Sequence, residues 1–247
     1  MSSMFCYQCE QTAKCMGCTS FGVCGKDPET AVLQDLLMYG LKGLSQFAHR
    51  ARELGVTERD INVATVEGLF TTVTNVNFDP ERVGEEILRV AEKRDRAKAL
   101  YEEAAVRAGR EPEQLEGPAC WQPASDIAGM IRQGEQITIE DRKERLGEDV
   151  TGLQELLTYG LKGAAAYADH AQLLGYEDDS IYAFFHKALA YLAEEPCNPD
   201  ELTKMCLECG EMNLGVMQLL DTAHTSTYGH PEPTPVRVTP VTGKAIL

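Results

Sequence analysis

The sequence is poor in basic residues and has no long apolar run. Its 247 residues hold 23 Lys and Arg against 39 Asp and Glu, a formal net charge of −16. A surface of that sign repels nucleic-acid phosphates and anionic lipids, so neither is expected as a partner. No apolar run reaches the roughly 18 residues that span a bilayer. The segment from Met1 to Phe5 also lacks the basic and apolar regions of an export signal. These absences predict a cytoplasmic protein.

Histidine is scarce, whereas cysteine is abundant in one place. The five histidines show no H-E-x-x-H or comparable ligand spacing, and carboxylates such as Glu85 and Glu86 follow helix faces. No acid/base pair stands out. Of the nine cysteines, five fall between Cys6 and Cys24. In a chain without an export signal such crowding favours metal binding over disulfides.

The remainder of the chain has helical periodicity. Three segments begin with a capping residue followed by proline at the first helical position, at Asp27, Asp79 and Asn198. Apolar residues then recur at three-to-four spacing, which predicts an all-α fold. The expected helices cover residues 28–55, 59–76, 80–108, 149–175, 178–194 and 199–224, with short helices at 125–133 and 138–146.

An internal repeat organises these helices. Residues 33–56 (LQDLLMYGLKGLSQFAHRARELGV) match residues 153–176 (LQELLTYGLKGAAAYADHAQLLGY) at 13 of 24 positions, with an offset of 120. We therefore predict two three-helix bundles related by internal duplication. The expected divisions are a cysteine-rich loop at 1–27, bundles at 28–112 and 149–228, a connector at 113–148, and an extended tail at 229–247 that begins a further, missing domain.

Glycines inside the repeated helix predict a close approach by another part of the chain. Gly40 and Gly43, with Gly160 and Gly163 in the second copy, each cost up to about 1 kcal/mol relative to alanine in a helix interior. The favoured interpretation is a close helix crossing. The alternative is that Tyr39, Gly40 and Lys42 face a cofactor.

The cysteine segment has the pattern of a metal centre. Its spacing is C-x2-C-x8-C-x5-C, and glycines and aromatic residues between the cysteines would allow tight turns and screen the site from water. This favours an iron-sulfur cubane, while a structural zinc site, a disulfide or an acidic interaction domain without metal stays open. Four cysteines form the pattern: Cys6, Cys9, Cys18 and Cys24.

These residues resemble a known family. The runs MFCYQCEQTA, GVCGK, LQDLLMYGLKG and LLDTAHTSTYGHPEPTPV are similar to the N-terminal part of the hybrid-cluster proteins, also called hydroxylamine reductases, which have the carbon monoxide dehydrogenases as distant relatives. The resemblance implies two three-helix bundles and a [4Fe-4S] cluster on Cys6, Cys9, Cys18 and Cys24. It also implies that this cluster relays electrons to a hybrid cluster held by two further α/β domains. The hybrid cluster would reduce hydroxylamine to ammonia, and nitric oxide reduction is also proposed for the family.

The chain ends before those domains would begin, so we expect it to relay electrons without completing that chemistry. The expected partners are a redox protein, the missing α/β domains and, as an option, a second copy of the chain. Cys206 and Cys209 share one helix face, which fits small buried apolar residues better than a second metal site. The resemblance assigns no role to five cysteines: Cys15, Cys120, Cys197, Cys206 and Cys209.

Overall fold

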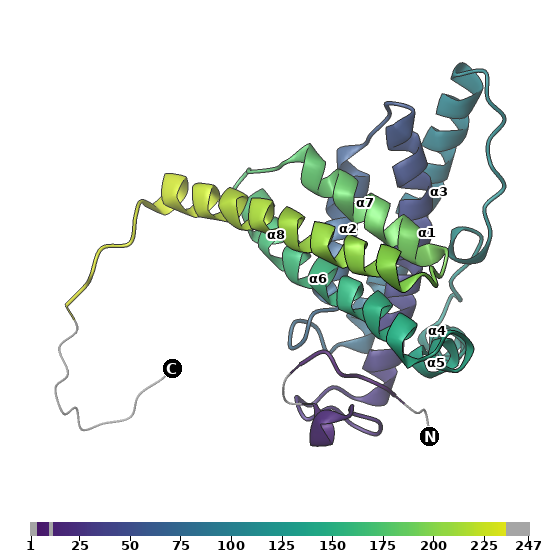
Figure 1. Cartoon of the computed structure of the whole chain (residues 1–247), viewed down its shortest axis with the longest axis horizontal. Coiled ribbons are helices and arrows are strands. Elements are labelled where there is room, and N and C mark those ends of the chain that lie inside the picture. The colour runs from purple at the N-terminus through teal and green to yellow at the C-terminus, as the bar shows by residue number, and fades with distance from the viewer. Residues whose placement is uncertain (1–3, 10–11, 236–247) are drawn as a thin grey trace.

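The computed structural model describes residues 4–9 and 12–235, and over this range the protein is all-α, as predicted. The described residues contain no strand, only an isolated bridge between Cys6 and Cys18. Figure 1 shows the helices and the N-terminal loop below them. The helices are α1 (Pro28–Glu53), α2 (Arg59–Thr71), α3 (Pro80–Arg107), α4 (Ile127–Gly134), α5 (Ile139–Leu146), α6 (Glu148–Leu173), α7 (Asp179–Ala193) and α8 (Pro199–Tyr228), with 3-10 turns η1 (Ala13–Cys15) and η2 (Gly117–Ala119).

The three predicted capping residues begin their helices. The Asp27 carboxylate accepts a hydrogen bond from the Thr30 amide at 2.7 Å, and Asp79 and Asn198 cap α3 and α8 in the same way. Each is followed by proline, whose missing N–H costs nothing in the first turn. Two helix ends differ from the prediction by more than two residues: α2 stops at Thr71, and α8 continues to Tyr228.

The helices of the two halves pack across each other. Within the first half α1 packs on α3, and within the second α6 packs on α8. However, α7 packs mainly on α1, and α2 packs on α6 as well as on α1 and α3. One continuous core joins Leu33 and Leu41 to Leu161 and Phe185. The two halves therefore share one core, and the division into bundles at 28–112 and 149–228 stays a prediction, because an apolar stripe specifies which face is buried and not which helix covers it.

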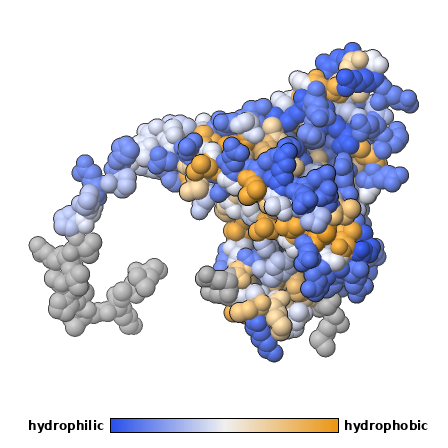
Figure 2. Space-filling view, viewed as in Figure 1, coloured by the Kyte–Doolittle hydropathy of each residue, from blue (hydrophilic) through white to orange (hydrophobic). Residues whose placement is uncertain are grey.

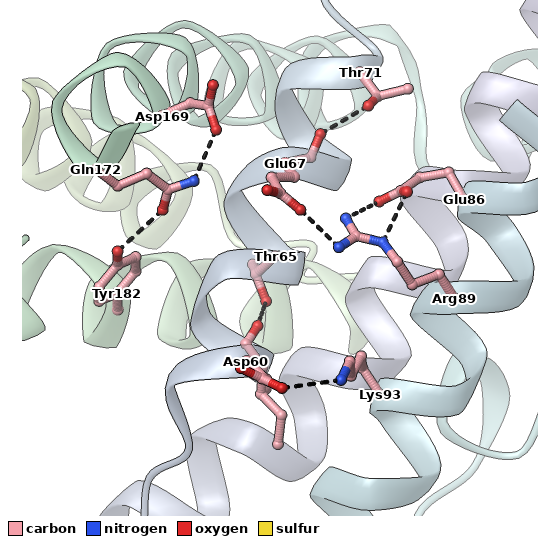
Figure 3. A network of polar contacts seen from close by, with 11 residues as sticks. Asp60, Thr65, Glu67, Thr71, Glu86, Arg89, Lys93, Asp169, Gln172 and Tyr182 are labelled. Atoms are coloured by element: carbon pink, nitrogen blue, oxygen red, sulfur yellow. Dashed lines mark hydrogen bonds and ion pairs between the residues drawn. The ribbon is translucent and has the colours of Figure 1, made fainter. Parts of the chain in front are cut away.

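Polar contacts also link α2 to α3 and α6 to α7. Arg89 of α3 lies 2.6 Å from the Glu67 carboxylate of α2, and Lys93 lies 3.4 Å from Asp60 (Figure 3). The Tyr182 hydroxyl of α7 donates to the Gln172 side chain of α6 at 3.2 Å. Partly exposed ion pairs are worth about 0–1 kcal/mol, so the apolar core carries most of the stability.

The connector between the halves crosses α1 at Gly43. A Cβ atom on Gly43 would lie 2.2 Å from the Pro118 carbonyl oxygen of η2. The expected close approach is therefore present, although its partner is the connector backbone and not a helix. In the second copy, Gly160 makes the expected helix crossing, since a Cβ there would lie 2.8 Å from the Cys209 sulfur of α8.

The C-terminal end of α8 projects away from the other helices, and residues 229–235 continue it as an extended, exposed segment (Figure 1). Apolar patches interrupt the hydrophilic surface in the region of α8 (Figure 2), where Leu207 and Leu214 are exposed. The strand-like residues 236–247 lie outside the described part. None of the described helices is long and apolar enough to cross a membrane.

Candidate functional site

The cysteine loop is anchored by a short antiparallel pairing. The Cys6 amide donates to the Cys18 carbonyl at 3.0 Å, and the Cys18 amide donates to the Cys6 carbonyl at 2.7 Å. Residues paired in this way project their side chains from the same face. Met4 and Cys18 pack with Ala31 of α1 in a small apolar cluster separate from the main core. The loop therefore presents two of the predicted ligands side by side against the first turns of α1.

Two glycine positions explain the course of the loop. Gly17 has φ +142°, and a Cβ atom there would lie 2.6 Å from the Phe5 ring. Gly25, with φ +97°, turns the chain toward α1. The Phe5 and Tyr7 rings are tilted toward each other with centroids 5.1 Å apart, and Tyr7 meets Tyr159 of α6 edge to face with centroids 5.4 Å apart. Phe5 and Tyr7 are half-buried, whereas Phe21 is exposed, and an aromatic screen around the cysteines stays a prediction.

Hydrogen-bond donors surround the Cys18 sulfur. The Ala13 amide donates to Cys18 Sγ at 3.5 Å, and the Thr12 hydroxyl lies 3.9 Å from it. Backbone amides of Val23 and Ala13 lower the pKa of the Cys18 thiol, whereas burial raises the pKa of Cys6. Because the thiolate is the form that binds metal, the Cys18 environment favours a ligand.

The structure brings together only part of the predicted ligand set. Cys18 is buried and Cys15 is exposed. The other three cysteines of the loop are half-buried, namely Cys6, Cys9 and Cys24. Within residues 4–9 and 12–235, no three His, Cys, Asp or Glu side chains are grouped to hold a metal ion. No disulfide joins any of the nine cysteines, all of which lie in the described ranges. The four-cysteine ligand set remains a prediction.

The remaining cysteines have ordinary structural surroundings. Cys120 and Cys197 are exposed. Cys209 is buried against Gly160, and burial raises its pKa to about 11, so it stays a neutral thiol. The half-buried Cys206 thiol donates to the Leu153 carbonyl at 3.6 Å. These contacts fit the packing role expected for the pair.

A cavity of about 510 Å³ adjoins the loop. Phe5, Cys6 and Gln8 line it on the loop side. The repeated motif lines it from both copies, and each copy contributes a carboxylic acid, a tyrosine and a lysine at the same three positions. These side chains are Asp35, Tyr39 and Lys42 of α1, and Glu155, Tyr159 and Lys162 of α6.

The cavity agrees in part with the alternative interpretation of the repeat, since Tyr39 and Lys42 do line an internal space. Sequence reasoning did not select Asp35, Glu155 or Lys162. A usable signal was present: charged residues recur at these positions in both copies of a helix that is otherwise largely buried.

Burial shifts the ionisation of the charged groups in this cavity. It raises the pKa of Asp35 to about 6 and lowers those of Lys42 and Lys162 to about 8. Glu155 is held by Arg142 at 2.5 Å. With its amide oxygen turned toward α6, Gln8 accepts from Lys162 Nζ at 2.9 Å and donates to the Thr72 carbonyl at 3.2 Å. These two contacts link the cysteine loop to α6 and to the end of α2.

The protein is thus an all-α protein with a cysteine-rich loop beside a charged cavity. Comparison with known sequences identifies its family. A sequence model of the Prismane/CO dehydrogenase family matches residues 4–247, so the chain belongs to that family. Similar proteins include hydroxylamine reductases of Rhodospirillum rubrum (50% identity), Acidithiobacillus ferrooxidans (48%) and Geobacter metallireducens (46%). Each match covers 99% of this chain and 44% of the relative, so the chain spans less than half the length of these proteins.

Proposed function

We propose that the N-terminal loop holds a [4Fe-4S] cluster through the thiolates of Cys6, Cys9, Cys18 and Cys24, and that the domain relays electrons. The observation that carries the proposal is the pairing of Cys6 with Cys18, which places two thiols on one face of the loop. The amide donors at the Cys18 sulfur are of the kind that stabilise thiolate ligands. The residues present therefore fit an anionic, thiolate-bound group.

The cluster would supply one-electron transfer, at a potential set by its charge, its burial and hydrogen bonds to sulfur. Several residues of this chain act on those properties. The Ala13 amide donates to the Cys18 sulfur, which stabilises negative charge there, and the Thr12 hydroxyl donates to the Cys6 carbonyl. Phe5 and Tyr7 place aromatic rings between the cysteine loop and Tyr159 of α6, which adds apolar surface beside the proposed cluster.

The relatives suggest the setting of this relay. They are named hydroxylamine reductases, and this chain corresponds to 44% of their length. We propose that the chain is the electron-relay part of such a reductase and works in the cytoplasm. It would receive electrons from a redox protein and pass them to α/β domains that reduce hydroxylamine to ammonia, and nitric oxide reduction is a second candidate activity. Assembly as a homodimer is a further option within the same proposal.

Metal analysis of anaerobically purified protein tests the proposal. We expect about four irons and four sulfides per chain, with a brown chromophore. Serine at Cys6, Cys9, Cys18 or Cys24 should remove most of the colour. Cys15→Ser is the matched control in the same loop and should keep it, because Cys15 is exposed and outside the four-cysteine pattern.

Three results would contradict this assignment. One zinc without sulfide would favour a structural zinc module. Bleaching by Cys15→Ser with retained colour in Cys18→Ser would show that the ligands were chosen wrongly. An interaction domain would be favoured if the unaltered chain binds no metal and the variant with all four cysteines replaced still folds.

A further inference from the structure

The cavity between α1 and α6 has an excess of positive charge in its interior. Arg142 is neutralised by Glu155 at 2.5 Å. The uncompensated interior groups are three ammonium groups and one carboxyl, namely Lys26, Lys42, Lys162 and Asp35. The carboxyl of Asp35 has a pKa of about 6, so at pH 7 it cancels at most one of the three positive charges.

Two of the lysines are deeply buried, and among the described residues they are bound only to neutral groups. Lys26 is 2% exposed and donates to the Gln34 side-chain oxygen at 2.5 Å. Lys162 is 5% exposed and donates to the Gln8 amide oxygen. Within residues 4–9 and 12–235, no carboxylate lies within ion-pair distance of Lys26, Lys42 or Lys162. A buried ammonium group without a counter-ion is costly, so a bound anion would remove part of that cost.

The acidic residues at the rim do not supply the missing negative charge. Glu195 is paired with Arg145 at 2.7 Å. The side chain of Glu194 is 60% exposed, and Asp141 is likewise exposed, so water and salt screen both. Anions would meet repulsion from the outer surface of a chain with charge −16, but not from the interior of this cavity.

The two copies of the repeat reach the cavity from different helices. Lys42 and Lys162 occupy corresponding positions in α1 and α6, and Tyr39 and Tyr159 bring a hydroxyl from each helix. Both lysines have pKa values of about 8 and are therefore mostly charged at pH 7. A volume of about 510 Å³ is in the range of small-molecule sites, which is about 300–1,000 Å³.

We propose that this cavity is a binding site for a small anion, a phosphate-like oxyanion or a carboxylate, held between Lys26, Lys42 and Lys162. The cavity adjoins the proposed cluster ligands through Cys6, which lines it. Lys42 and Lys162 lie on the helices α1 and α6, outside the cysteine loop.

Isothermal titration at pH 7 in a chloride buffer tests the proposal, with inorganic phosphate, sulfate and malonate as probes. We expect at least one of them to bind saturably with one ion per chain. Lys42→Met should weaken that binding about tenfold or more, because a charge-assisted hydrogen bond is lost. Lys98→Met is the matched control, since Lys98 is half-exposed on α3 and does not line the cavity. It should bind as the unaltered chain does.

Folding and cluster content are checked in the same samples. Methionine at position 42 keeps a long side chain without its buried charge, so Lys42→Met should fold and retain its iron. Loss of anion binding with unchanged helical signal and iron content supports the site, whatever the metal proves to be. Absence of saturable binding by all three probes would overturn the proposal. Equal weakening by Lys98→Met would also overturn it, because the anion would then be responding to overall charge.

Discussion

The internal duplication provides a matched test of how the connector packs on α1. Gly43 and Gly163 occupy equivalent positions of the repeated motif. A Cβ atom on Gly43 would lie 2.2 Å from the Pro118 carbonyl oxygen and 2.5 Å from its carbon, whereas a Cβ on Gly163 would have no atom within 4 Å. The connector cannot easily move away, because Arg94, 1% exposed, donates to the Trp121 carbonyl.

The two alanine substitutions should therefore act in opposite directions. Overpacking costs about 1–3 kcal/mol, and a contact with backbone belongs at the upper end. The gain in helix propensity offsets about 1 kcal/mol of this, so Gly43→Ala should lower the free energy of unfolding by about 2 kcal/mol. Gly163→Ala has the gain without the clash and should raise the free energy of unfolding by about 0.5–1 kcal/mol.

Urea unfolding followed by far-UV circular dichroism measures both effects, with the slope m expected to stay constant. For a chain of this size about 2–4 °C of melting temperature corresponds to 1 kcal/mol, so the two variants should be separated by several degrees. Shifts of the same sign in both variants would refute the reasoning, because only propensity would then be acting.

Two further predictions concern pH and metal removal. His186 is 1% exposed, accepts from Arg52 Nε at 3.2 Å, and has a pKa lowered to about 3 by burial. The pKa of His186 in the folded protein lies below the unfolded value of about 6.5. Neutral His186 therefore contributes stability that is complete above pH 6.5 and declines as the pH falls toward 3. Acid unfolding titrations should show that His186→Gln loses less stability over that interval, and an identical decline would contradict the assignment. Removal of iron should leave the far-UV helical signal largely intact, because the loop cluster around Met4 and Cys18 is separate from the main core. Amide exchange should become fast at the described loop residues, and a global loss of helix would show that the metal centre nucleates the fold.

Local signals were sufficient to predict the helices. Capping side chains, proline at the first helical position and three-to-four periodicity act within a few residues, so the sequence located α1, α3 and α8 to within a few positions. The cysteine spacing and the repeat are likewise properties of the sequence alone. They predicted a cysteine loop and two related helix sets, and the family match agrees with the resemblance seen in the motifs.

Tertiary structure decided which helices are neighbours and what the repeated charges face. Periodicity in α7 and α2 marks a buried side, but only the assembled core places α7 on α1 and α2 on α6. The charged positions of the motif look alike in both copies. Their shared cavity exists because α1 and α6 bring them together beside the cysteine loop. Contacts between residues more than a hundred positions apart depend on the packing of whole helices, and no local pattern encodes that choice.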